Sequence, residues 1–532
     1  MSKRPKVLIS LLLVSLNVLL ADVGLNSLFS DHMVIQQNTT IPVWGWANPQ
    51  EKIEITTSWG EKVETVTAQD STWRVSLKTP SAGGPFRMIV SGDNTIVIDD
   101  ILSGEVWLCT GQSNMDFAVG KFINDAREEK YQPLVEYIRK EVATANDPWL
   151  RNIEVSQETS IFKKKKNFDG KWVSVNPKDI KKITATGYFF AKELRKYLNV
   201  PVGIIECSWG GTRIQPWLSE EAYQSDAELK AYFDQGRARI RKELAELGPA
   251  DEYVDTSYEG RYKAWVDGGK MTNRPYPKKY PTEDNQIEAT LYNGMLSTVM
   301  PYGIKGVIWY QGESNSHYLE EEYEKYFKLM IQSWRKEWGQ GDFSFYWAQL
   351  AAYRVNDKRS DLGWAMVNDH LRRGLDLPHT GMAVLYDIGE AKDVHPHNKM
   401  EAGKRLSLWA LKQDYGINIP VISGPLYKSA KVEHNAMVVE FTSTGSGLMV
   451  GSKELMYDTE RSLAPLSSFQ IKGADGIWKE ASADIITDKS IKVYSPEVAH
   501  PLAVRYAWSS NPENANLYNC EGLPAAVFTT EE

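Results

Sequence analysis

Two short loops in this chain carry residues whose types and spacing could perform nucleophilic catalysis. The loop GQSNM, residues 111–115, places Ser113 in a tight turn after the apolar run VWLCT. A serine hydroxyl is a weak nucleophile until a base removes its proton. The loop DVHPH, residues 393–397, offers such a base, because Asp393 stands two residues before His395 and could orient its imidazole. Taken alone, these loops could also be an ordinary turn and a surface or capping histidine.

Two further loops could stabilise the negative charge that such an attack creates. In SWGGT, residues 208–212, Gly210 and Gly211 allow backbone N–H groups to approach an anion closely. In QGESN, residues 311–315, the Gln311 side-chain amide could donate a hydrogen bond to an oxyanion. A Gly-Gly turn explains the first loop equally well. Glu313 could belong to a glycosidase carboxylate pair, but the sequence shows no clear second acid.

Neither a metal nor a cofactor is expected. Asp393, His395 and His397 are possible metal ligands, but Pro396 restricts how two imidazoles could face one ion. No paired Cys/His spacing typical of zinc occurs in the sequence.

The three cysteines are too few for a disulfide-stapled scaffold. Cys109 and Cys207 lie inside apolar runs, which predicts buried free thiols. A Cys109–Cys207 disulfide is the alternative.

Strands that alternate with helices must position the four loops. Apolar runs such as EVWLCT, VGIIEC and GVIWY predict buried strands. Helical apolar spacing occurs in TATGYFFAKELRKYL, QIEATLYNGMLSTVM, YEKYFKLMIQSWRKEW and NKMEAGKRLSLWALKQ. This alternation predicts an α/β domain over residues 101–423 with a parallel sheet. Because ligands bind at the carboxyl ends of strands in such sheets, we expect the four loops to meet there.

Other segments flank and interrupt this domain. Residues 22–100 and 424–532 show extended runs and turn signals, which predict a β-domain of sandwich or jelly-roll type at each end. Residues 120–180 and 219–286 are charged insertions. We expect KKKK, at residues 163–166, to be a solvated loop. The second insertion could be helical or form a lid over the site.

The net charge and the N-terminus limit the partners and the location. A net charge of −8 argues against nucleic acid and against an anionic membrane surface, since both attract basic proteins. Three basic residues precede the apolar run VLISLLLVSLNVLLA, which ends at Ala21 and predicts a cleaved signal peptide at residues 1–21. We therefore expect a secreted or periplasmic protein with no membrane span after cleavage.

Taken together, GQSNM, SWGGT, WYQGESN and DVHP resemble the sequence blocks of SGNH hydrolases of the sialate O-acetylesterase family. The opening LFSDHMVIQQNTTIPVWGWANP and the closing NLYNCEGLPAAVF also resemble this family. The resemblance thus covers nearly the whole chain after residue 21, and the GxSxG motif of α/β-hydrolases is absent. It implies a three-layer α/β/α core of the SGNH type and removal of O-acetyl groups from carbohydrates.

The resemblance also implies roles for individual residues. Ser113 matches the family nucleophile, His395 the general base and Asp393 the acid that orients it. The matching oxyanion hole consists of the Ser113 backbone N–H, Gly210 or Gly211, and Gln311.

Two departures from the family pattern leave alternatives open. Many SGNH enzymes place the acid three residues before the histidine, where this chain has Lys392. The rival orienting acids are therefore Asp387, Glu390 and Glu313. The usual Gly-x-Asn-Asp block is replaced by QGESN, so Asn315 rivals Gln311 as the oxyanion donor.

The function that follows is a serine esterase that forms an acetyl-serine intermediate and needs no cofactor. Its partner is an acetylated glycan or oligosaccharide, either a sialate or a hemicellulose such as xylan. The alternative is a non-catalytic glycan-binding protein on the same fold. Loss of Ser113 or His395 would mark that alternative, and both are present. A lipid esterase would want an apolar acyl groove, whereas these loops are polar and aromatic.

Overall fold

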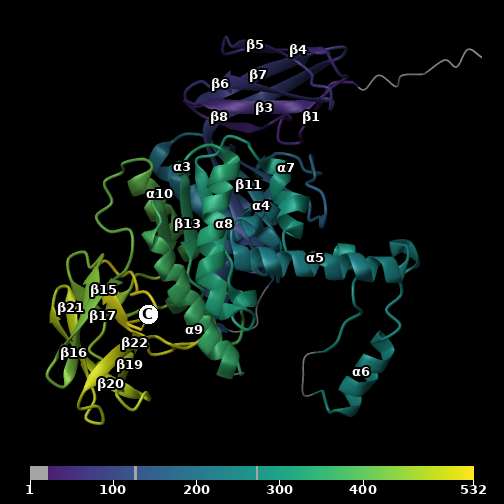
Figure 1. Cartoon of the computed structure of the whole chain (residues 1–532). Helices are drawn as coiled ribbons and strands as arrows, with labels where there is room; N and C mark the ends of the chain where they lie inside the picture. Colours follow the sequence, from purple (N-terminus) through teal and green to yellow (C-terminus); the bar gives the residue numbers. More distant parts are fainter. Residues whose placement is uncertain (1–21, 125–128, 271–273, 357, 532) are drawn as a thin grey trace, which may run out of the picture.

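The computed structural model describes residues 22–124, 129–270, 274–356 and 358–531 (Figure 1). The predicted signal peptide, residues 1–21, lies outside the described residues. Within the described ranges, no helix combines the length and the apolar character needed to cross a membrane. An α/β domain carries a β-domain at each end, which confirms the predicted fold class.

The N-terminal β-domain forms from strands that bury every second side chain. In β6 (Thr72–Lys78), the buried residues run from Trp73 to Leu77 in alternation with exposed ones. β4 and β5 form a hairpin and pair antiparallel, with Ile55 opposite Val63. The strands before the core are β1 (Gly24–Leu25), β2 (Val34–Gln36), β3 (Thr40–Trp46), β4 (Lys52–Thr57), β5 (Lys62–Val66), β6 and β7 (Gly83–Ser91). The next strand, β8 (Thr95–Gly111), pairs with β7 and continues into the central sheet, so residue 100 lies inside one strand.

A mixed sheet forms the centre of the molecule, in the order β10-β9-β11-β8-β12-β13-β14. Its strands beside β8 are β9 (Asp147–Glu154), β10 (Val173–Val175), β11 (Val202–Ser208), β12 (Gly306–Tyr310), β13 (Ser344–Ala348) and β14 (Thr380–Ala383). Neighbours from β9 to β14 run parallel, as predicted. The edge strand β10 is antiparallel to β9, because the chain returns through a loop without a crossover helix. Two strands of the sheet thus come from residues 120–180.

Helices cover both faces of this sheet. On β13, Trp347 contacts Phe327 of α8 (Tyr323–Trp338), whereas the adjacent Tyr346 contacts Trp409 of α10 (Lys399–Gln413). Adjacent strand residues point to opposite faces, so α8 and α10 lie on opposite sides of the sheet (Figure 1). α3 (Ala185–Leu198) packs beside α10, and α9 (Lys358–Arg373) packs beside α8.

Shorter helical elements complete the α/β domain. They are α1 (Ser113–Asp116), η1 (Val119–Phe122), η2 (Glu129–Tyr131), α2 (Gln132–Thr144), η3 (Asp179–Lys182), η4 (Gln215–Trp217), η8 (Glu313–Asn315), η9 (Glu320–Glu322), η10 (Gly374–Asp376) and η11 (Tyr386–Ile388). The helix expected at residues 286–300 is instead a π-helical turn, η7 (Tyr292–Leu296), followed by α7 (Ser297–Val299). Pro301 follows closely, and the residue before a proline disfavours helix.

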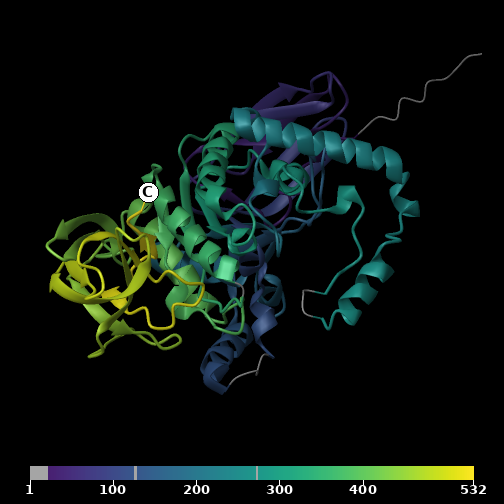
Figure 2. The same ribbon diagram turned by 60° about the horizontal axis from the view of Figure 1, so that its bottom comes forward.

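The insertion at residues 219–286 is helical. It contains α4 (Glu220–Gln224), α5 (Ala227–Leu247), η5 (Ala250–Glu252), α6 (Tyr258–Asp267) and η6 (Pro281–Glu283). α5 extends beyond the core, and α6 stands apart from it in both views (Figures 1 and 2). The end of the insertion returns to the SWGGT loop, where Gln286 Nε2 donates to the Gly211 carbonyl over 3.0 Å.

The C-terminal β-domain is built on a seven-stranded sheet in the order β15-β16-β21-β20-β19-β22-β24. Its strands are β15 (Leu426–Glu433), β16 (Ala436–Thr442), β17 (Leu448–Ser452), β18 (Glu460–Arg461), β19 (Leu466–Gly473), β20 (Trp478–Thr487), β21 (Ser490–Tyr494), β22 (Pro501–Tyr506), β23 (Leu517–Asn519) and β24 (Phe528–Thr529). Buried rings hold it to the core, since Tyr386 and Tyr506 join their hydroxyls over 3.1 Å.

Cys109 and Cys207 are free and buried, as predicted, and Cys520 is also free. In the register of β8 and β11, Cys109 lies opposite Glu206 and Cys207 lies opposite Thr110. The two thiols therefore point to opposite faces of the sheet, which excludes the alternative disulfide.

Candidate active site

Ser113 lies just past the carboxyl end of β8, as the first residue of α1. The turn before it requires glycine, because Gly111 has φ +136° and a Cβ there would lie 2.2 Å from the Tyr310 carbonyl oxygen. The Ser113 side chain is half-buried. Among the described residues, its hydroxyl has no hydrogen-bond partner. No hydrogen bond within the described residues therefore restrains the hydroxyl at this edge of the sheet.

The side chain before Ser113 ties its loop to the QGESN loop. Gln112 Oε1 accepts hydrogen bonds from the backbone N–H groups of Gly312 and Ser314, over 3.3 and 3.2 Å. Gln112 is almost fully buried. The side-chain amide thus sets the distance between two of the predicted site loops.

The side chain after Ser113 ties three loops together. Asn114 Nδ2 donates to Glu313 Oε1 over 2.5 Å and to the Val394 carbonyl over 3.0 Å. Asn114 Oδ1 accepts from Lys399 Nζ over 2.5 Å. Lys399 is buried at the start of α10 and also donates to the Pro396 carbonyl over 3.0 Å. One buried amide therefore joins the Ser113 segment to the loop that carries His395.

His395 packs on the Ser113 segment. Its imidazole stacks on Phe117, with ring centroids 5.0 Å apart, and its side chain is 29% exposed. Asp393 Oδ1 lies 3.6 Å from His395 Nδ1 and accepts the His395 backbone N–H over 2.9 Å. Within the described residues, no hydrogen bond joins His395 to Ser113. Catalytic hydrogen bonds are often long in a site without substrate.

Two of the rival orienting acids are paired with other side chains. Asp387 accepts two hydrogen bonds from Arg405, over 2.6 and 2.9 Å, in a buried bidentate pair. Glu390 Oε1 contacts His397 Nδ1 over 2.7 Å and accepts the His397 backbone N–H over 2.6 Å. His397 is thereby held inside the protein, stacked on Tyr131 at 5.1 Å.

The third rival, Glu313, lies close enough to His395 for their charges to interact. Burial raises the pKa of Glu313 above its ordinary value, although the hydrogen bond from Asn114 and the positive charges of His395 and Lys399 act in the opposite direction. Its Oε2 atom is buried and has no hydrogen-bond partner among the described residues. Of the four candidate orienting acids, Asp393 and Glu313 are thus the two near the His395 imidazole.

The Gly-Gly loop lies against Ser113. A Cβ on Gly210 would contact the Ser113 Cβ at 3.4 Å and Asp116 Oδ2 at 3.5 Å. Gly211 has φ +74°, in the left-handed region that favours glycine, and a Cβ there would contact nothing within 4 Å. The backbone of the SWGGT loop therefore faces Ser113. A side chain larger than that of glycine at position 210 would fill the space between the loop and Ser113.

The two candidate oxyanion amides are engaged in the protein. Gln311 Nε2 donates to the Thr212 carbonyl over 3.1 Å and to Asn315 Oδ1 over 2.8 Å, and Tyr323 donates to its Oε1 over 2.8 Å. Asn315 Nδ2 donates to Gln215 Oε1 and to the Tyr318 carbonyl, over 3.1 and 3.2 Å. Both side chains are fully buried. They join the QGESN loop to the SWGGT loop.

Sequence reasoning missed Lys399 and Phe117. Burial lowers the pKa of Lys399 to about 7, against the raising effect of nearby Glu313, Glu390 and Asp393. No sequence signal shows that a lysine at the start of a helix is buried. The described residues contain no group of three or more metal-ligating side chains that could hold an ion.

Comparison with known proteins identifies the family of this chain. A family model described as "Carbohydrate esterase, sialic acid-specific acetylesterase" matches residues 103–244 and 268–413, more than half of the chain. The chain belongs to this family. It is a carbohydrate acetylesterase and thus a carboxylic ester hydrolase.

Relatives of this esterase match it over nearly their whole length. The sialate O-acetylesterase of Mus musculus is 26% identical over 95% of this chain and 91% of its own. That of Homo sapiens is 25% identical over 94% of this chain and 91% of its own. The crystal structure of a carbohydrate acetylesterase from Xanthomonas citri is 32% identical, with a TM-score of 0.76, and covers 96% of this chain and 99% of that one. The similarity therefore includes both β-domains.

Proposed function

We propose that this esterase removes O-acetyl groups from a glycan through an acetyl-serine intermediate on Ser113. His395 takes the hydroxyl proton as Ser113 Oγ attacks the acetyl carbonyl. The tetrahedral intermediate collapses, the sugar oxygen leaves with the proton from His395, and the acetyl group stays on Ser113. Water then attacks the acetyl-serine and passes its proton to His395. Acetate leaves, and the proton returns to the serine oxygen.

Asp393 is the orienting acid in this proposal. It is 3.6 Å from His395 Nδ1 and fixes the loop by accepting the His395 backbone N–H. Asp387 and Glu390 are already paired with Arg405 and His397. Glu313 Oε1 accepts a hydrogen bond from the Asn114 side-chain amide, so its role in this proposal is to hold that amide in place.

The backbone N–H groups of Ser113 and Gly210 are the oxyanion donors that this geometry favours, because Gly210 approaches the Ser113 Cβ. Gly211 contributes through its left-handed conformation, which shapes the loop. Gln311 stays a prediction as a further donor. To reach an oxyanion it would have to release the Thr212 carbonyl or Asn315.

The observation that carries the proposal is the hydrogen bond from Asn114 to the Val394 carbonyl, which holds the Ser113 segment against the His395 segment. Two sugar classes remain as substrates, a sialate and a neutral hemicellulose such as xylan. Arg213 follows the Gly-Gly loop and is a cation that a sialate carboxylate could use. Its guanidinium lies 3.5 Å above the Tyr318 ring.

The test is acetate release from 4-nitrophenyl acetate and butyrate release from 4-nitrophenyl butyrate, by wild type and by Ser113→Ala and His395→Ala. We expect both variants to lose at least about a thousandfold in kcat, and the wild type to prefer acetate. Ser81→Ala and His434→Ala, at exposed positions of the two β-domains, are the matched controls. Full activity in Ser113→Ala would contradict the serine mechanism. O-acetylated xylan and O-acetylated sialic acid then separate the two substrate classes.

A further inference from the structure

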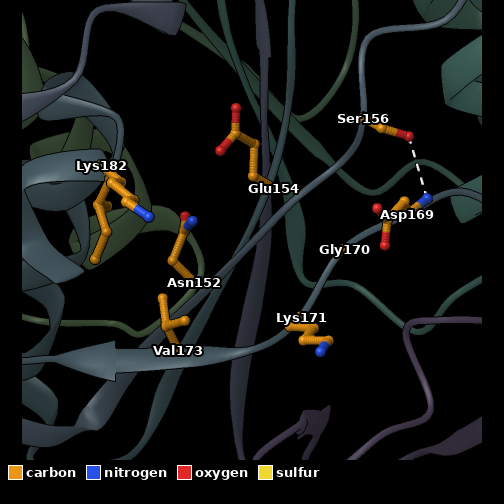
Figure 3. A pocket seen from close by; sticks show the side chains of 9 residues that line it. Asn152, Glu154, Ser156, Asp169, Gly170, Lys171, Val173 and Lys182 are labelled. Atoms are coloured by element: carbon orange, nitrogen blue, oxygen red, sulfur yellow. Dashed lines mark hydrogen bonds between the residues drawn. The ribbon is translucent and has the colours of Figure 1, made fainter.

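A concave site lies beside β9, and we call it the β9 pocket. Its polar lining comes from Asn152 and Glu154 on β9, Ser156, Asp169, Lys171 and Lys182 (Figure 3). The cavity volume is about 480 Å³, within the range of ligand sites, about 300–1,000 Å³. In Figure 3 the Lys182 ammonium and the Asn152 amide turn toward each other, and Asp169 and Lys171 lie on the opposite side.

The fold uses the Ser156 hydroxyl, which accepts the Asp169 backbone N–H over 3.1 Å, but within the part of the chain that the structure describes it leaves the charged groups of the pocket unpaired. Among the described residues, the charged ends of Glu154, Asp169, Lys171 and Lys182 make no hydrogen bond or ion pair. Asn152 is 3% exposed, and its Oδ1 atom is buried without a hydrogen-bond partner. A buried acceptor that lacks a partner is unusual and costs free energy. The pocket therefore offers donors and acceptors that a ligand could satisfy.

The charges of the lining balance. Two carboxylates, of Glu154 and Asp169, face two ammonium groups, of Lys171 and Lys182. An anionic ligand would therefore find no excess of positive charge in the lining. Hydroxyl groups both donate and accept, and they suit a lining that contains both kinds of partner.

Hydrogen bonds connect the rim of the pocket to the catalytic loops. Gln157 directly follows Ser156, and its Nε2 donates to the Ser208 carbonyl over 3.1 Å and to Asp116 Oδ1 over 3.3 Å. Asp116 lies in α1 with Ser113. In the register of β9 and β11, Glu154 lies opposite Glu206, near the carboxyl end where the SWGGT loop begins. A chain of sugars with one unit at Ser113 could thus reach this pocket.

We propose that the β9 pocket binds a neutral sugar unit of the same glycan whose acetyl group is cleaved at Ser113. The proposal rests on the esterase function proposed above and adds a subsite to it. Hydroxyls of this unit accept from Lys171 and Lys182 and donate to Glu154 and Asp169. The subsite makes the enzyme favour an oligosaccharide over a single acetylated sugar.

The first test compares O-acetylated xylotriose with O-acetylated xylose. We expect wild type to have the higher kcat/KM on the trisaccharide. Glu154→Gln and Lys182→Met should each reduce the ratio of the two kcat/KM values by about fivefold to tenfold, as loss of a hydrogen bond to a charged group predicts. Lys178→Met, on the exposed residue just before η3, is the matched control and should leave the ratio unchanged. An unchanged ratio in both pocket variants would overturn the proposal.

The second test measures binding without catalysis. Titration calorimetry with xylotriose on Ser113→Ala should give a dissociation constant that rises about fivefold to tenfold when Glu154→Gln is added. Sialyllactose is the anionic comparison. Tighter binding of sialyllactose, lost with Lys182→Met but kept with Glu154→Gln, would overturn the assignment of a neutral sugar. Because this readout needs no turnover, it stays valid if Ser113 proves not to be the nucleophile.

Discussion

Asn114 and Val394 lie 280 positions apart in the chain, and a hydrogen bond of 3.0 Å joins the Asn114 side-chain amide to the Val394 carbonyl. Asn114 follows Ser113, and Val394 precedes His395. This bond fixes the distance between the proposed nucleophile and the proposed base, although neither residue takes part in it. The same amide binds Glu313 and Lys399, so one side chain organises three loops.

Removal of this amide should affect both stability and turnover. We expect Asn114→Ala to lower the free energy of unfolding by about 3 kcal/mol, because Glu313 and Lys399 lose a buried partner. The kcat should also fall, since the His395 loop is no longer held against Ser113. Urea unfolding and 4-nitrophenyl acetate kinetics measure the two effects. Asn356→Ala, in an exposed loop, is the control. A destabilised variant with wild-type kcat would show that the bond does not position the pair.

Lys399 should make stability depend on pH in a predictable direction. Burial lowers its pKa to about 7 from an ordinary value of 10.5. Between these values the unfolded chain binds more protons than the folded protein, so this group makes stability rise with pH. The free energy of unfolding of wild type relative to Lys399→Met should therefore increase from pH 7 to pH 10. Lys404→Met, on the same helix and about half exposed, should show little such trend. If the free energy of unfolding of wild type relative to Lys399→Met were the same at pH 7 and pH 10, the lowered pKa would be contradicted.

The acid that orients His395 can be identified by neutral substitutions. We expect Asp393→Asn to reduce kcat by about 10²-fold to 10⁴-fold, as loss of the orienting carboxylate does in serine hydrolases. Glu390→Gln should mainly reduce stability, since it pairs with the buried His397. Asp393→Asn and Glu313→Gln are compared in kcat on 4-nitrophenyl acetate. A larger loss in Glu313→Gln than in Asp393→Asn would assign the orienting role to Glu313.

Substitution of Gln311 can distinguish a structural role, in which its amide joins two loops, from a direct role as a donor to the oxyanion. If its amide only joins loops, Gln311→Ala and Asn315→Ala should both lower the melting temperature, with similar effects on kcat, because each removes buried hydrogen bonds. If Gln311 also donates to the oxyanion, its variant should lose about 10²-fold to 10³-fold in kcat beyond that of Asn315→Ala. Differential scanning fluorimetry and single-turnover acetate release distinguish the two.

Much of the fold is predictable because it depends on local patterns. The helices at α3, α8 and α10 follow the spacing of apolar residues, and the strands at β8, β11 and β12 follow continuous apolar runs. The antiparallel β10 and the π-helical turn η7 were not predictable. β10 is only three residues long, and it is defined by its partner rather than by its own sequence.

The sequence alone determined the fold class, the four loops at strand ends and the residue types available for ester hydrolysis. The tertiary structure decided which of these side chains meet. It placed Asp387 on Arg405 and Glu390 on His397, and it left Asp393 beside the His395 imidazole. It also buried Lys399 and brought β9, Asp169 and Lys182 around one pocket. The reason is physical: strand and helix formation depends on neighbours in sequence, whereas hydrogen-bond partners depend on how distant loops pack.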